Sequence, residues 1–331
     1  MAAHPGGDEN AFPIKTHFTY QQQIHRYKFL STLFHYPTMR NIRIGVLGPS
    51  LLVIVSILWG TSFPLIKMVV SKINAGEYVA FRFSLAVLLI LPYFIHSLFR
   101  NRRKLREAAG PGTILGILYF GGIFLQGLGT GYTSASNSGF ITSLYIPIVY
   151  TIDVLRQRFN YNHRFTVALI LSVTGMYLIS GGSYESRIGD LLVLAGAFFW
   201  ALQVLAVDKF AKKYFSLDLV FFQYAVTAVM GFILFPVEAG FENIIGVFPL
   251  LLYLAAVCSI LVGILQVLGQ KYTTASQAVL VYALEPVSAA LFAFMILGEK
   301  LGAVESIGAI LILVSVTLSL IEISKLSKES R

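Results

Sequence analysis

The sequence predicts an all-α polytopic membrane protein with ten transmembrane helices, arranged as two inverted five-helix repeats. Three observations support this prediction. Hydrophobic residues make up 56% of the 331 residues and charged residues only 12%, too few to cover a soluble globule of this size. Apolar stretches of about twenty residues recur along the chain, each long enough to cross a hydrocarbon core about 30 Å thick. The third observation is an internal repeat with an offset of 140 residues.

The first half of the chain holds a polar tail and five apolar stretches. Residues 1–48 lack the apolar core of a signal peptide, so we predict that they form a poorly ordered cytosolic N-terminal tail. Residues 49–182 are predicted to form the first five-helix repeat, because charges, Gly or Pro separate their apolar runs. The predicted helices cover residues 49–70, 78–99, 113–131, 134–155 and 165–180.

The second half has the same organisation. Residues 188–323 are predicted to form the second five-helix repeat, and residues 324–331 a cytosolic C-terminal tail. The predicted helices cover residues 191–207, 217–237, 245–268, 275–297 and 304–323.

The distribution of Lys and Arg among the loops predicts the orientation. With a cytosolic N-terminus, nearly all loop cations fall in the tails or in the loops on the same side. The loops on the other side hold only Lys72, Arg187 and Lys300. By the positive-inside rule, we expect a multi-pass protein of the cell (plasma) membrane with both termini in the cytosol.

The two halves are related in sequence. When residues 128–144 are aligned with residues 268–284, the identical positions are Leu128, Gly129, Tyr132, Thr133, Ala135, Ser136 and Leu144. Trp59 and Trp200 also correspond, at an offset of 141. Because each repeat has five spans, an odd number, the second half enters the membrane in the opposite sense from the first. Inverted repeats can exchange conformations around one central site, which favours a transporter.

Four short motifs follow one another along the chain. They are W-G-T-S-F-P at residues 59–64, Arg82-Phe83, N-S-G-F at residues 137–140, and E-P-V at residues 285–287 followed by Gly298-Glu299. Together with the repeat, they resemble the pattern of EamA-type transporters of the drug/metabolite transporter superfamily. The resemblance covers about residues 49–323.

This resemblance implies a secondary active transporter that moves small metabolites, such as amino acids or related solutes, or drugs, by alternating access and without ATP hydrolysis. We expect an exporter that has a small-molecule solute and membrane lipid as partners, a proton as coupling ion, and no cofactor. A passive channel, a membrane sensor and an exchanger of sugar phosphates or nucleotide sugars are the alternatives. The exchanger would need more cations in the middle of the membrane than this sequence offers.

Motifs of other functional classes are missing from the sequence. It has no H-E-x-x-H metal motif, no paired Asp of the proteolytic type and no G-x-x-x-x-G-K-[ST] phosphate loop, so we expect neither an enzyme nor an ATP-driven pump. The net charge is +9, but most of the Lys and Arg residues sit in short loops between apolar runs, without interleaved aromatic residues. This argues against a nucleic-acid partner. Cys258 is the single cysteine, so an intramolecular disulfide is impossible.

Glu285 is the main candidate for a functional charge. It lies near the midpoint of the ninth predicted span, where a carboxylate is costly and faces a cavity or a partner. It could couple transport to protons or contact the solute. Alternatively, it stays protonated, or pairs with Arg82, and holds helices together. Pro286 has no N–H and frees the carbonyl of Tyr282, so we predict a kink there.

Two cations, Arg82 and Lys67, lie inside predicted spans. Each could snorkel to the membrane surface. Alternatively, each could face the centre as a charge partner for Glu285 or for a solute carboxylate. In the second case the protein would suit anionic or zwitterionic solutes.

Aromatic and amide residues complete the predicted pathway. Trp59 and Trp200 fall near the middle of their spans, away from the interfaces where tryptophan collects, and Gln203 shares a helical face with Trp200. Helix packing alone is the alternative for the tryptophans. The residues predicted to line a solute pathway are Trp59, Phe63, Asn137, Tyr145, Trp200, Gln203, Tyr282 and Glu285.

Small residues and prolines predict features of helix packing. Gly127 and Gly131 form a small-x-x-x-small pair, which favours close packing within the chain or contact in a homodimer. Pro64 and Pro147 predict kinks, which either serve as hinges or are static.

Overall fold

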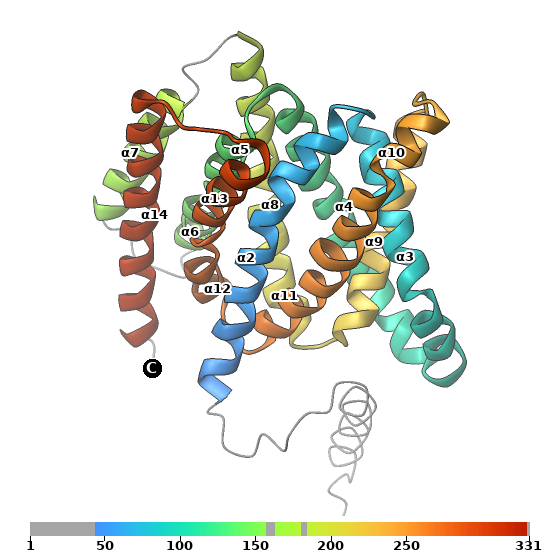
Figure 1. The fold of residues 1–331 in the computed structure, drawn as a ribbon. Coiled ribbons are helices and arrows are strands. Elements are labelled where there is room, and N and C mark those ends of the chain that lie inside the picture. The colour runs from blue at the N-terminus through green and yellow to red at the C-terminus, as the bar shows by residue number, and fades with distance from the viewer. Residues whose placement is uncertain (1–43, 157–162, 180–183, 330–331) are drawn as a thin grey trace, which may run out of the picture. The chain divides into compact units, whose positions relative to one another are not determined.

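A computed structural model describes residues 44–156, 163–179 and 184–329, and every regular element in these ranges is a helix. The N-terminal tail is predicted at residues 1–48, of which residues 1–43 lie outside the described residues. The first described helix begins within the predicted tail, at Ile44. The observed elements confirm an all-helical protein (Figure 1).

The helices of the first half are α2 (Ile44–Val70), α3 (Ala75–Arg100), α4 (Arg102–Tyr132), α5 (Ala135–Thr142), α6 (Tyr145–Leu155) and α7 (His163–Ile179). The second half contains α8 (Tyr184–Ala211), α9 (Ser216–Leu234), α10 (Phe241–Tyr253), the π-helical segment η1 (Leu254–Leu261), α11 (Val262–Lys271), α12 (Ala275–Tyr282), α13 (Glu285–Leu297) and α14 (Ala303–Glu329).

Among the described residues, six helical stretches are long and apolar enough to cross a membrane. This supports a membrane protein, while the count of ten spans stays a prediction. The remaining predicted spans fall on the interrupted pairs α5–α6 and α12–α13, on α7 and on α14. The six stretches are Leu47–Val70, Ala75–Arg100, Arg102–Tyr132, Ser186–Ala211, Ser216–Leu234 and Phe241–Lys271.

Two helices are interrupted at equivalent positions of the sequence repeat. Residues 143–144 separate α5 from α6, and residues 283–284 separate α12 from α13, so the interruptions lie 140 positions apart. Pro147 and Pro286 follow the interruptions, and each lacks the N–H that a continuous helix would need. Pro286 sits in the first turn of α13, where no such donor is required. The kinks predicted at these prolines are therefore full interruptions, whereas α2 continues past Pro64.

Successive rods of the bundle run in opposite directions, when α5–α6, α10–η1–α11 and α12–α13 are each taken as one rod, and this defines two ends of the bundle (Figure 1). We call the end at which α2 finishes and α3 begins the α2–α3 end. The start of α2 and the finish of α14 lie together at the opposite end. The turns between α4 and α5 and between α13 and α14 lie at the α2–α3 end.

Glycines let helices of the two halves touch at the level of the backbone. A β-carbon at Gly129 on α4 would lie 2.5 Å from the carbonyl oxygen of Gly189 on α8. A β-carbon at Gly127 would lie 3.0 Å from the ring of Tyr78, and one at Gly131 would lie 3.7 Å from Val70. The pair predicted for packing or for a homodimer thus packs against helices of its own chain.

The approach of α2 to α13 yields a stability prediction. A β-carbon at Gly60 would lie 2.1 Å from the Oγ of Ser288 and 2.8 Å from its backbone carbon. We expect Gly60→Ala to overpack this interface at a cost of about 1–3 kcal/mol. The melting temperature of the purified protein should fall by several degrees. Gly110→Ala, where nothing lies within 4 Å, is the matched control and should not lower it. Equal melting temperatures for both variants would contradict this prediction.

Candidate functional site

A small cavity lies where α2, α3, α4, α8 and the two interrupted helices meet. Its free volume is about 30 Å³, enough for about two water molecules. The site therefore offers only a water-sized space in this conformation. The cavity is lined by Trp59, Ser62, Arg82, Tyr119, Ile123, Gln126, Thr142, Tyr145, Trp200, Gln203, Val204 and Glu285.

Arg82 is one of the two charged residues of the cavity. It is 1% exposed, so the predicted alternative of snorkelling to the membrane surface is wrong for this residue. The Nε of Arg82 donates to the Oγ of Ser259 at 2.9 Å, and Nη1 donates to the hydroxyl of Tyr78. Ser259 belongs to η1, and π-helical turns are frequent at functional sites. These neutral acceptors fix the guanidinium without neutralising its charge.

Glu285 is the second charged residue of the cavity and lies in the first turn of α13. Its side chain is buried, and Oε2 accepts a hydrogen bond from the hydroxyl of Tyr145 at 3.1 Å. Among the described residues, Arg82 has no carboxylate within 4.0 Å, so the predicted pairing of Arg82 with Glu285 is absent from this conformation. An isolated buried charge is unfavourable. A guanidinium and a carboxyl group thus face one cavity without meeting.

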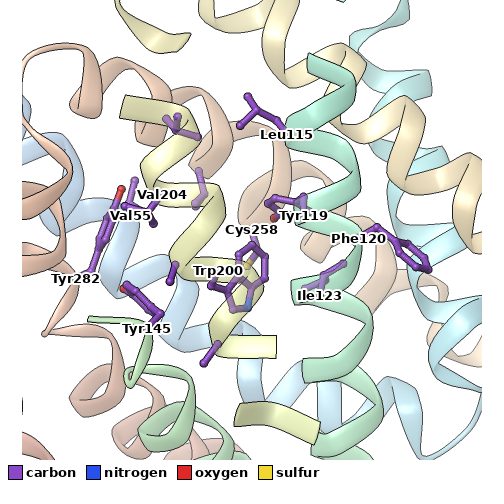
Figure 2. Close-up of a cluster of buried hydrophobic side chains, with 14 of the residues drawn as sticks. Val55, Leu115, Tyr119, Phe120, Ile123, Tyr145, Trp200, Val204, Cys258 and Tyr282 are labelled. Carbon is purple, nitrogen blue, oxygen red and sulfur yellow. The ribbon is translucent and has the colours of Figure 1, made fainter. Parts of the chain in front are cut away.

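Aromatic and amide groups form the rest of the cavity wall. The indole Nε1 of Trp200 donates to the Oε1 of Gln126 at 2.8 Å, and the amide of Gln203 exchanges hydrogen bonds with that of Gln266. Figure 2 shows Trp200 between the side chains of α4 and Tyr145. The wall therefore combines flat apolar surfaces with neutral polar groups, which suits a small polar organic molecule.

The remaining predicted residues lie outside the cavity lining. Tyr282 packs its ring against Trp59, with 5.3 Å between centroids. Phe63 belongs to a separate apolar cluster, and Asn137 is buried on α5. Lys67 donates to backbone carbonyls beyond the cavity. The structure therefore brings together Trp59, Arg82, Tyr145, Trp200, Gln203 and Glu285, and not Phe63, Lys67, Asn137 and Tyr282.

Residues related by the sequence repeat meet at this cavity. Trp59 and Trp200, with an offset of 141, both line it. Tyr145 and Glu285, with an offset of 140, line it and are hydrogen-bonded to each other. The cavity therefore lies where equivalent parts of the two halves come together.

The sequence profile of the EamA-like transporter family matches the chain twice, at residues 46–181 and 187–321. The chain belongs to this family. The match confirms the predicted resemblance to EamA-type transporters.

Two relatives of this EamA-type chain are themselves described only as uncharacterized transporters. One, from Archaeoglobus fulgidus, is 30% identical over 267 residues, which cover 80% of this chain and 83% of the relative. The other, YyaM from Bacillus subtilis, is 27% identical over 288 residues, covering 83% and 92%. A solved crystal structure aligns with a TM-score of 0.57 at 16% identity, over 84% of this chain and 98% of that chain, so the two share a fold.

Two glutamines of the EamA-type site were missed by the sequence analysis. Gln126 holds the indole of Trp200, and Gln266 holds the amide of Gln203. They are equivalent to each other at the repeat offset of 140. Extending the repeat alignment two residues toward the N-terminus would have identified both.

Metal binding finds no support in the part of the chain that the structure describes. No group of three or more His, Cys, Asp or Glu side chains gathers there in a way that could hold an ion. Cys258 is buried, and its Sγ lies 3.6 Å from the Oγ1 of Thr61, as is usual for a cysteine packed between helices.

Proposed function

We propose that this chain is a secondary active transporter that exports small zwitterionic metabolites, amino acids or related solutes, by alternating access. In this proposal it crosses the cell membrane ten times as two inverted five-helix repeats, with both termini in the cytosol. The solute binds in the central cavity, and a proton is the coupling ion.

The observation that carries the proposal is the presence of one basic and one acidic side chain in the cavity lining. Arg82 and Glu285 both line it, and neither is neutralised by a described side chain of opposite charge. A solute carboxylate on Arg82 and a solute amine on Glu285 would satisfy both charges at once. A phosphorylated sugar would find a single cation among the described lining residues, and would meet the carboxyl group of Glu285.

The size of the cavity supports a carrier. A free volume of about 30 Å³ is below that of an amino acid, so binding must open the site toward one end of the bundle. The hydrogen bond between the repeat-equivalent Tyr145 and Glu285 supports a site near the symmetry axis of inverted repeats. Both features fit a carrier in which the halves exchange conformations.

The decisive experiment is transport by purified protein in liposomes. We expect saturable uptake of zwitterionic amino acids that increases when a pH gradient is imposed. Matched analogues lacking the carboxylate or the amine should compete poorly. Uptake of these analogues as efficient as that of the parent solutes would overturn the proposed solute class. Currents that exceed carrier turnover would indicate a channel instead.

A further inference from the structure

The turn between α4 and α5, Thr133–Ser134, is held at the α2–α3 end by a lysine from another helix. The Nζ of Lys67 on α2 donates to the carbonyl oxygens of Gly131 at 3.0 Å and Thr133 at 2.6 Å. These carbonyls belong to the C-terminal end of α4, which carries partial negative charge. A cation is therefore the favourable side chain at this position.

A glutamate from the second half holds the other side of the same turn. The carboxylate of Glu299 accepts hydrogen bonds of 2.9 Å from the backbone N–H groups of Ala135 and Ser136, and a third from the Oγ of Ser136. The first turn of α5 favours an anion there. Gly298, with a φ of 68°, ends α13 in a left-handed conformation and turns the chain toward α5. We call Lys67, Glu299 and the turn Thr133–Ser134 the clasp.

An apolar plug lies between the clasp and the cavity. It consists of the fully buried side chains of Phe63, Ala135, Ala289 and Ala293. Along α2, Ser62 lines the cavity, Phe63 belongs to the plug, and Lys67 belongs to the clasp.

The same order holds along α13. Glu285 lines the cavity, Ala289 and Ala293 belong to the plug, and Glu299 follows in the clasp. The path from the cavity to the α2–α3 end is thus closed by two successive layers.

The opposite end of the bundle has no equivalent clasp residues in its sequence. The position equivalent to Lys67, at an offset of 141, is Asp208, which pairs with Lys212 on its own helix at 2.8 Å. The position equivalent to Glu299, at an offset of 140, is Phe159, which lies outside the described residues. The two ends therefore differ in charge even where the repeat aligns.

We propose that the clasp is a gate at the α2–α3 end, and that it makes the carrier favour conformations closed at that end. Opening that end separates α2 and α13 from α5, which leaves the carbonyls of α4 and the N–H groups of α5 without their charged partners. At the opposite end, the two sequence positions equivalent to Lys67 and Glu299 are Asp208 and Phe159, so the same pair of charges cannot act there. This inference rests on the proposed alternating access, because it assigns unequal populations to the two open states.

Accessibility of the cavity from each side of the membrane tests the gate. A reporter thiol is introduced as Thr142→Cys in a Cys258→Ser chain, because Thr142 lines the cavity and its Oγ1 makes no hydrogen bond within the described residues. A membrane-impermeant thiol reagent is applied to either side of liposomes holding the oriented protein. We expect Lys67→Met and Glu299→Gln each to raise the labelling rate from the α2–α3 side about tenfold.

Two further variants separate a gate from general damage. Asp208→Asn, at the position equivalent to Lys67, should leave labelling from both sides unchanged. The double variant Lys67→Glu, Glu299→Lys should label at least as fast as the single variants, because each exchanged charge then faces a helix end of its own sign. Wild-type labelling in the exchanged variant would show a simple ion pair and overturn the clasp.

The result also separates this inference from the proposed function. Unchanged labelling from the α2–α3 side in Lys67→Met and Glu299→Gln would overturn the gate, even if the wild-type protein transports amino acids. Faster labelling from that side only, with no amino-acid transport by the wild type, would support the gate and overturn the proposed solute. Faster labelling from both sides would indicate loosened packing and overturn the gate.

Discussion

Arg82→Gln is expected to lower the apparent affinity for carboxylate-bearing solutes about 30-fold or more, because removing one partner of a buried charge pair costs about 2–5 kcal/mol. Glutamine occupies the equivalent position of the second half, Gln223, where it is also buried. The substitution therefore removes the charge but keeps a polar side chain suited to this environment. Uptake measured over a range of solute concentrations gives the change in KM.

A solute that lacks the carboxylate provides the control for Arg82→Gln. Its weak uptake should be unchanged or improved, since it never used the guanidinium. Arg82→Lys should recover only part of the affinity, because an ammonium cannot reproduce the paired contacts to Ser259 and Tyr78. If Arg82 only holds α3 against η1, Arg82→Gln will lower the melting temperature. The KM for each of the two solutes will then stay at its wild-type value.

The sequence predicted those parts of the site that depend on the repeat and on residue type. Trp59, Trp200 and Glu285 are unusual residues for the middle of a span, and all three line the cavity. The fate of Arg82 could not be decided in this way, because its position one turn inside a span fits both snorkelling and burial. Its orientation depends on Ser259, which the π-helical turn of the eighth predicted span presents to it.

The partners of Lys67 and Glu299 could not be predicted from the sequence, because they are backbone atoms. Lys67 was considered as a charge partner for the solute, but its partners are the carbonyls of Gly131 and Thr133. Glu299 was noticed as part of a motif, yet it binds the N–H groups that begin α5. Such partners carry no residue-type signal, and they are brought close only when distant helices pack.

Glu285→Gln is expected to abolish accumulation of solute driven by a pH gradient, while exchange of solute across the membrane continues at saturating solute with a raised KM, because the carboxyl group also contacts the solute amine in the proposed site. Glu285 is the only carboxylic acid among the described residues that line the cavity, so it is the group there that can gain and lose a proton. Glutamine has nearly the same shape and can still accept the hydrogen bond from Tyr145. The accumulation ratio is measured with and without the gradient, and the exchange of labelled for unlabelled solute is measured in parallel.

The two measurements on Glu285→Gln distinguish coupling from binding. If Glu285 served only to bind the solute amine, saturating solute would restore both exchange and accumulation, whereas a coupling role predicts that accumulation stays lost when exchange is restored. Glu107→Gln is the matched control, because Glu107 is an exposed acid paired with Arg103 on α4, far along the chain from the cavity residues of that helix. Normal gradient-driven accumulation in Glu285→Gln would refute proton coupling at this site. Recovery of both activities at saturating solute would limit the carboxyl group to binding the solute amine, with the coupling ion still to be located.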